Sequence, residues 1–231
     1  MLTKPFTRRA VLGSLAVCAA SPPVCAAPAV DLALVLAIDC SYSVDALEYQ
    51  QQMQGTARAL MAPEILQAIT GGARKRIAIS AFLWSDPLIQ FVMVPWQLLQ
   101  NAEDAKAVAH VFLRSPRDVP KETTATGSAL LFAHSLLLTA PPAFRRVIDI
   151  STDGECNSGP KVNAVRDAIV AQGIVINGLA ITKDTSDLDT YLRENVIGGD
   201  QSFVITATDF DAYGESLREK LFREITNVDL I

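Results

Sequence analysis

The sequence predicts an α/β fold: a doubly wound, mostly parallel sheet with one antiparallel edge strand and helices on both faces. Two observations predict it. Apolar runs of strand length, such as "LALVLAI" at 32–38, alternate along the chain with segments whose apolar residues recur every three or four positions. Strands without polar alternation are typical of a parallel sheet covered on both faces, and the closely spaced runs 76–84 and 89–96 indicate a hairpin at its edge.

Six segments have the length and apolar content of strands. Pro95 is expected to end the third of them, because proline cannot donate to a sheet ladder and is confined to edge strands. In chain order the predicted strands are 30–38, 76–84, 89–96, 146–151, 173–181 and 202–207.

The segments between these strands show helical spacing. Ser43 or Asp45 can cap the first helix, which follows the first strand directly. Pro160 is expected at the first position of a later helix, where its missing N–H costs nothing. The apolar face of the first helix is Ala46, Tyr49, Met53, Ala57 and Leu60. The other predicted helices are 102–113, 128–138, 160–173, 188–196 and a C-terminal helix with Phe210, Tyr213, Leu217, Leu221 and Ile225 on one face.

Residues 1–29 have the pattern of a secretory signal peptide, which leaves 30–231 as a single domain. Lys4, Arg8 and Arg9 precede the apolar stretch "AVLGSLAVCAA", and small residues follow it. The stretch is too short for a bilayer, which takes about 20 apolar residues. The Arg8-Arg9 pair fits twin-arginine export of a folded chain as well as it fits an ordinary secretory signal. The predicted location is periplasmic or secreted.

The charge balance excludes one class of function. The chain has 20 basic and 25 acidic residues, and three of the basic ones lie in 1–29, so the remainder carries a formal charge of −8. A nucleic-acid-binding domain normally shows a basic patch, and this sequence shows none, so we expect no nucleic-acid partner. No second apolar span of membrane length follows residue 29, so no transmembrane segment is expected in the mature chain.

Three loops carry matching oxygen chemistry. The first is Asp39-x-Ser41-x-Ser43, directly after a buried strand, and the second is "TTATGSAL", with Thr124 just before a helix. The third is "ISTDGECN", in which Asp153 follows another buried strand. In a doubly wound sheet the ligand site lies beyond the carboxyl ends of the strands, where the strand order reverses. Carboxylates and hydroxyls without histidine suit Mg²⁺ or Mn²⁺.

Each loop also has a purely structural interpretation. Ser43 and Asp45 are good helix caps, Thr126 could cap the helix that follows it, and Asp153-Gly154 could simply form a turn. We favour a metal site because all three loops are expected at one edge of the sheet.

These residues resemble the metal-ion-dependent adhesion site (MIDAS) of the von Willebrand factor A-type domain. The matching segments are Asp39-x-Ser41-x-Ser43, then Thr124-Ala-Thr-Gly127-Ser-Ala-Leu130, then Asp153-Gly154. The resemblance spans 30 to about 227 and is strongest to an uncharacterised bacterial branch, domain of unknown function 1194, through "VDLALVLAID", "VPW", "GIVINGLAI" and "YLRENVIGG". It implies that Asp39, Ser41, Ser43, Thr124 and Asp153 bind Mg²⁺ or Mn²⁺, and that a carboxylate from a protein partner completes the metal shell. Tyr42 departs from the small residue that relatives mostly carry at that spacer.

Three functions are compatible with this pattern. The leading hypothesis is a metal-dependent binding module whose partner-facing rim includes Tyr42, Glu155 and Lys121. The alternative is a metal-assisted hydrolase, which needs a general base near the cation, and Glu155 is the only candidate we can name. The third is a metal-free structural relative. No catalytic residue is predicted, because no nucleophile-base pair stands out and "GxSxG" is absent.

Cys40 and Cys156 are the two cysteines that remain after residue 29. Cys40 follows Asp39 directly and Cys156 lies three residues after Asp153, so both thiols are expected near the metal loops. An oxidising compartment would allow a disulfide between them. Alternatively, Cys40 is a small residue buried behind the first loop.

Overall fold

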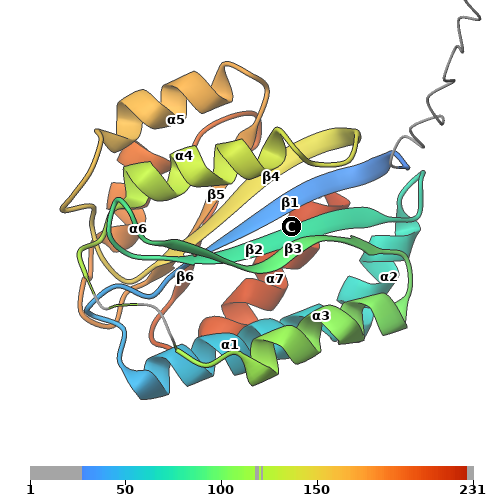
Figure 1. Ribbon diagram of the computed structural model, residues 1–231, viewed down its shortest axis with the longest axis horizontal. Coiled ribbons are helices and arrows are strands. Elements are labelled where there is room, and N and C mark those ends of the chain that lie inside the picture. Colours follow the sequence, from blue (N-terminus) through green and yellow to red (C-terminus); the bar gives the residue numbers. More distant parts are fainter. Residues whose placement is uncertain (1–27, 118–119, 121, 228–231) are drawn as a thin grey trace, which may run out of the picture.

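A single six-stranded sheet organises the computed structural model, which describes residues 28–117, 120 and 122–227 (Figure 1). The strand order is β3-β2-β1-β4-β5-β6, and only the β2–β3 pair is antiparallel. This confirms the predicted fold class. The strands are Val30–Asp39 (β1), Ile77–Trp84 (β2), Gln90–Leu99 (β3), Ala143–Thr152 (β4), Val175–Ile181 (β5) and Val204–Ala207 (β6).

The strand order reverses beside β1. The chain first builds outward through β2 to β3, then crosses to β4 on the other side of β1 and continues to β6. The carboxyl ends of β1 and β4 therefore lie next to each other, with Ile38 in register with Ser151. Such a reversal leaves a crevice at the carboxyl edge of the sheet, where open α/β sheets bind their ligands.

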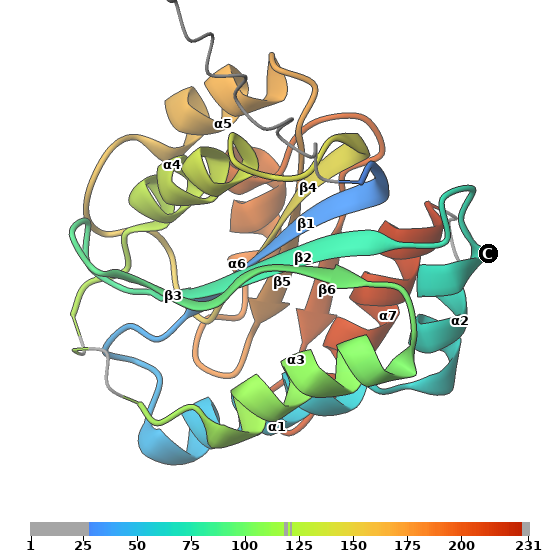
Figure 2. The same cartoon turned by 45° about the vertical axis from the view of Figure 1, so that its right-hand side comes forward.

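Helices cover both faces of the sheet, as Figures 1 and 2 show. One face is covered by Ala46–Leu60 (α1), Pro63–Gly71 (α2), Ala102–Arg114 (α3) and Tyr213–Thr226 (α7). The other face is covered by Thr126–Leu137 (α4), Val162–Val170 (α5) and Leu188–Tyr191 (α6), which continues as a π-helical turn, Leu192–Val196.

Alternation along β1 divides the interior into two cores. Leu34 and Leu36 pack on the α1 side of the sheet, whereas Val35 and Ala37 pack on the α4 side. On the α1 side, α1 and α7 approach closely because glycines meet where they pack. A Cβ placed on Gly55 would lie 2.9 Å from the Cα of Gly214.

The structure corrects three details of the predicted elements. Helix α2 was not predicted, because it is short and buries only Ile65 and Ile69. Strand β3 does not end at Pro95 but continues to Leu99. The proline is accommodated on an edge strand at a shift in the β2–β3 register, where the Ser80 hydroxyl donates to the Val94 carbonyl at 2.8 Å. Helix α5 begins at Val162 with Lys161 as its N-cap, so Pro160 precedes the helix.

A buried ionic cluster fastens α7 to the sheet. The Lys220 ammonium lies 2.8 Å from Asp149 Oδ1 of β4 and 2.7 Å from Glu224 Oε1, and all three side chains are at most 2% exposed. Asn177 of β5 donates to the same Glu224 oxygen at 2.9 Å. Burial raises the pKa of Glu224 to about 7, with repulsion from Asp149 adding to the rise and Lys220 opposing it.

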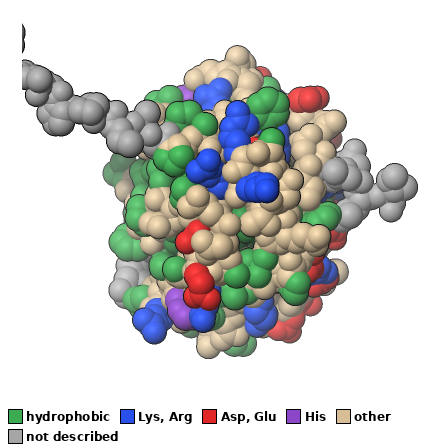
Figure 3. All heavy atoms as spheres, turned by 90° about the vertical axis from the view of Figure 1, so that its right-hand side faces the viewer, with side chains coloured by type: hydrophobic (Ala, Val, Ile, Leu, Met, Phe, Trp, Pro, Cys, Tyr) green, Lys and Arg blue, Asp and Glu red, His purple; other side chains and the backbone are tan. Residues whose placement is uncertain are grey.

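The end of the molecule opposite the carboxyl edge carries a mixed surface. Figure 3 shows basic side chains there in small groups, interspersed with acidic and apolar ones. Within the described part of the chain, no helix is long and apolar enough to cross a membrane. Residues 1–27 of the predicted signal peptide, and the predicted rim residue Lys121, lie outside the described residues.

Candidate metal centre

Asp39 is held in one orientation at the carboxyl end of β1. Its side chain is fully buried. Oδ1 accepts a hydrogen bond from the Ser41 N–H at 2.8 Å, and Oδ2 accepts one from the Thr152 hydroxyl at 2.5 Å. The strand end, the loop after it and the end of β4 thus fix the carboxylate together.

The other predicted ligands form a continuous set of oxygens with it. Ser41 Oγ lies 3.3 Å from Ser43 Oγ and accepts a hydrogen bond of 3.3 Å from the Thr124 hydroxyl. The Ser43 hydroxyl donates to Asp153 Oδ1 at 2.8 Å. The structure therefore brings all five side chains together, from loops up to 114 positions apart in the chain.

Both carboxylates are poorly solvated. Burial raises the pKa of Asp39 to about 7, and repulsion from Asp153 adds to the rise while hydrogen bonds from Thr152 and Ser41 oppose it. Burial also raises the pKa of Asp153, and the hydrogen bond from Ser43 opposes it. None of the ion pairs among the described residues includes either aspartate.

This donor set fits a divalent cation. Two buried carboxylates without a basic partner would be neutralised by two positive charges, and three hydroxyl oxygens are in place to join them. The described residues contain no group of three or more histidine, cysteine, aspartate or glutamate side chains suited to a metal. A cation here would therefore depend on hydroxyl ligands, which favours hard Mg²⁺ or Mn²⁺ over softer metals.

The structure also decides between the capping alternatives. Asp45, not Ser43, caps α1: it accepts from the Glu48 N–H at 2.9 Å, and the Glu48 carboxylate accepts in return from the Asp45 N–H at 2.6 Å. Thr126 is the first residue of α4 and does not cap it. Ser43 is thus free of a capping role and faces Asp153.

Arg117 stabilises the first metal loop, Asp39–Ser43, through hydrogen bonds to backbone carbonyls. Its guanidinium donates to the carbonyl oxygens of Cys40 at 2.9 Å, Ser41 at 3.2 Å and Asp45 at 2.8 Å, and also to that of Val44. Sequence analysis did not identify this role, because an arginine that binds backbone carbonyls has no sequence motif.

Asn157 holds the second loop in a similar way. Its side-chain oxygen accepts from the Thr124 N–H at 2.9 Å, and its own N–H donates to the Thr124 carbonyl at 3.0 Å. These two bonds join the second loop to the third. Asn157 was also missed, although it lies in the quoted segment "ISTDGECN".

Of the two alternatives for the cysteines, the structure has the unpaired one: Cys40 and Cys156 are both free, and Cys40 is buried. They pack on opposite faces of the sheet, Cys40 in the α1-side core and Cys156 against the α4-side core. Each thiol donates to a separate carbonyl, that of Trp84 at 3.3 Å and that of Ser158 at 3.2 Å. Asp39 and Asp153 converge because both loops lie at the carboxyl edge of the sheet. The two cysteines near them in sequence point into helical layers on opposite faces of the sheet.

Of the three proposed rim residues, the structure describes Tyr42 and Glu155. Tyr42 is 78% exposed beside the first loop, and Glu155 is exposed in the third. Both side chains are therefore accessible, and their contact with a partner stays a prediction.

The raised pKa of Asp39 leads to a prediction for the metal-free chain. The pKa of Asp39 is higher in the folded chain than in the unfolded chain, where it is near 4, so the buried carboxyl contributes fully to stability only below that lower pKa. This contribution is lost as the pH rises towards 7. We expect wild-type stability to fall by about 3–4 kcal/mol relative to Asp39→Asn across this window. Urea unfolding of both proteins in metal-free buffer from pH 4.5 to 8 measures it, and parallel curves would contradict it.

Comparison with known proteins gives the family and supports the fold. A family profile with the description "Protein of unknown function (DUF1194)" matches residues 29–229. A search of curated proteins returns no match.

Solved structures share the fold at low identity. One is proximal thread matrix protein 1 from the mussel byssus, with a TM-score of 0.65, 14% identity, and coverage of 85% of this chain and 48% of that one. A von Willebrand factor type A protein from Catenulispora acidiphila has a TM-score of 0.61, 19% identity, and coverage of 85% and 43%. The pilus adhesin SpaC from Lactobacillus rhamnosus GG has a TM-score of 0.63, 14% identity, and coverage of 86% and 31%.

A further structure of the thread matrix protein has zinc in its MIDAS motif. The present chain spans less than half of each of these three proteins. At such identities the likeness establishes the fold, and the profile match establishes the family. The chain belongs to the DUF1194 family and has the fold of a von Willebrand factor A domain.

Proposed function

We propose that this chain is an exported binding module that holds Mg²⁺ or Mn²⁺ at its carboxyl edge and recognises a protein partner through a carboxylate. One observation carries the proposal: Asp39 and Asp153 are both buried, have raised pKa values, and are linked by three hydroxyls in a cluster without a basic partner among the described residues.

Each residue has a part in this proposal. Ser41, Ser43 and Thr124 supply neutral oxygens, while Asp39 and Asp153 balance the charge and orient bound water. Three hydroxyl oxygens do not fill the six positions that Mg²⁺ prefers, so a carboxylate from a partner would have a position to occupy. Exposed Tyr42 and Glu155 form the rim that meets the partner, and Lys121, which lies outside the described residues, is assigned to it from the sequence alone.

Two structural neighbours support the proposal by analogy. The thread matrix protein holds zinc at its MIDAS motif, and SpaC is a pilus adhesin. Export is supported by the signal-like pattern in residues 1–29. The hydrolase alternative has less support, because Glu155, its only candidate base, is exposed and makes no side-chain hydrogen bond among the described residues.

Calorimetric titration of the purified chain with MgCl₂ and MnCl₂ tests the proposal. We expect one site per chain and a rise in thermal stability at saturating metal, because a ligand that binds only the folded state stabilises it. Absence of binding would leave the metal-free structural relative as the better description. Turnover of ester or phosphate substrates that requires the metal would favour the hydrolase.

Replacement of Arg117 should weaken metal binding without touching a ligand. Arg117→Ala removes the hydrogen bonds that order the carbonyls of the first loop. In the variant, part of the binding free energy is used to order this loop, because the loop is no longer held in place before the cation binds. Loss of groups that orient metal ligands typically costs about 10–100-fold in affinity, and we expect a loss in that range. Arg114→Ala is the matched control, because Arg114 lies three residues away and makes no bond to this loop. Equal affinities in the two variants would contradict the prediction.

A further inference from the structure

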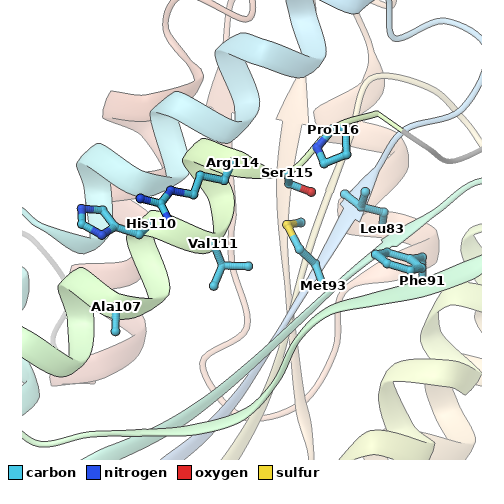
Figure 4. Close-up of a pocket in the computed structure, with 9 residues that line it drawn as sticks. All are labelled: Leu83, Phe91, Met93, Ala107, His110, Val111, Arg114, Ser115 and Pro116. Atoms are coloured by element: carbon cyan, nitrogen blue, oxygen red, sulfur yellow. The ribbon is translucent and has the colours of Figure 1, made fainter.

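An apolar groove of about 490 Å³ lies between α3 and the edge strand β3. Its lining includes Leu83, Phe91, Met93, Val111, Arg114 and Pro116. Figure 4 shows Val111 of α3 and Met93 of β3 on opposite sides of it, with Phe91 beside Met93 and Pro116 at one end. Phe91 is 55% exposed and Val111 is 40% exposed, so large apolar surface faces solvent here.

A basic stripe borders this groove. Lys106, His110 and Arg114 follow one another at intervals of four residues and so lie on one face of α3. All three are exposed, and their side chains make no hydrogen bond or ion pair with the described part of the chain. Residues 105–117 contain no acidic residue, whereas the chain as a whole has more acidic than basic residues.

The stripe continues onto a second hollow. A smaller apolar hollow of about 230 Å³ lies on the other side of α3 against α1, and Lys106 and His110 line it. Elsewhere on the surface, Arg193 and the half-buried Arg218 have acidic partners, whereas exposed Lys75 and Lys161 make no ion pair with the described residues. The outer face of α3 therefore combines apolar surface with positive charge that takes part in no ion pair with the described residues.

The groove leads to the candidate metal centre. It ends at Ser115 and Pro116, which both accept hydrogen bonds from the Tyr49 hydroxyl at 3.2 Å. The next residue is Arg117, whose guanidinium binds the carbonyls of Cys40 and Ser41 in the first metal loop. One extended segment of a partner could thus occupy the groove and reach the cation.

We infer that the partner presents an acidic peptide segment, whose apolar side chains enter the α3–β3 groove and whose carboxylates face Lys106, His110 and Arg114. The inference rests on the proposed function, because the same segment supplies the carboxylate for the cation. Charge complementarity selects an acidic occupant. The concave apolar lining selects a peptide over a bilayer, whose flat surface cannot enter a groove, and over nucleic acid, which has no apolar side chains to place there.

Selection from a random dodecapeptide display library against the full domain in MgCl₂ tests the inference. Selected peptides are synthesised with a fluorophore, and their affinity is measured by anisotropy. The test variant is Lys106→Glu with Arg114→Glu. The control is Lys75→Glu with Arg193→Glu, which changes the net charge equally at two exposed positions away from the groove. Asp39→Asn distinguishes the contribution of the metal to peptide affinity from that of the groove. Calorimetry checks that both double variants keep wild-type affinity for Mg²⁺.

The expected result is enrichment of peptides that combine aspartate or glutamate with apolar residues. Their affinity should fall at least about tenfold in the groove variant and stay unchanged in the control. Val111→Gln should also weaken binding, because it places an amide in the apolar lining.

Other outcomes overturn one proposal or the other. Selected peptides that lose affinity in Asp39→Asn but not in the groove variant would refute the groove and leave the metal-dependent function standing. Loss in the groove variant alone, with equal binding in EDTA, would support the groove and refute the metal-dependent function. Enrichment without acidic residues, or binding of phosphatidylglycerol vesicles that the groove variant abolishes, would refute the acidic peptide.

Discussion

Asp39→Asn and Asp153→Asn are each expected to reduce Mg²⁺ and Mn²⁺ affinity by at least about 100-fold, because each removes one of only two carboxylates in the candidate centre. The variants should still fold. Both aspartates have pKa values raised by burial, so a neutral amide of the same shape relieves desolvation and mutual repulsion at pH 7. Isothermal calorimetry measures affinity, and urea unfolding in EDTA measures stability.

Glu155→Gln is the matched control for this pair. It removes one negative charge from the same loop as Asp153, but from an exposed side chain outside the oxygen cluster. We expect near-wild-type metal affinity in this variant. Wild-type affinity in both aspartate variants would place any bound cation elsewhere, and a large loss in Glu155→Gln would indicate that general charge rather than coordination governs binding.

Lys220→Met is expected to lower the free energy of unfolding by about 3–5 kcal/mol at pH 7, because it leaves Asp149 and Glu224 buried without a counter-charge. The pKa of Glu224 is already raised, to about 7, and loss of Lys220 removes a contribution that opposes the rise. When burial raises the pKa of a carboxyl, the free energy of unfolding of the protein falls as the pH increases. The deficit of the variant should therefore be smaller at pH 5 than at pH 8.

Arg218→Met is the control within the same helix. Arg218 pairs with Glu64 and Glu215 at the surface, where ion pairs contribute about 0–1 kcal/mol. Adding Glu224→Gln to Lys220→Met should recover part of the loss, since a neutral amide needs no counter-charge. A Lys220→Met variant that loses no more than Arg218→Met would show that the cluster does not hold α7 in place.

The sequence predicts the layers of this fold well because periodicity reports burial. β1 is apolar at every position from 32 to 38, and the structure buries it on both faces. α2 escaped prediction because it is only nine residues long and buries only Ile65 and Ile69. The end of β3 was predicted wrongly at Pro95, because the sequence does not show that the β2–β3 register shifts at that point.

The candidate site was partly predictable for a similar reason. Side chains that follow neighbouring buried strands meet at the carboxyl edge, so the predicted ligands Asp39, Ser41, Ser43 and Asp153 could be grouped from the topology. Thr124, which precedes a helix, was assigned to the same edge by the expected position of its loop. Arg117 and Asn157 act through backbone groups of loops, and loop conformation does not follow from residue type. The sequence left the pairing of the two cysteines open, because adjacency to the aspartates fixes the edge of the sheet but not the layer into which each thiol points.

The separation of the two thiols offers a single labelling position beside the candidate centre. Burial raises the pKa of Cys40 to about 12, with Asp39 adding to the rise, so its thiol is a poor nucleophile in the folded chain. Cys156 is half-buried and precedes Asn157, whose bonds hold the Thr124 loop. A maleimide dye on the folded domain 30–231 would therefore react at Cys156 and place a fluorescent reporter next to the hydrogen bonds that join the second and third loops, with no engineered cysteine.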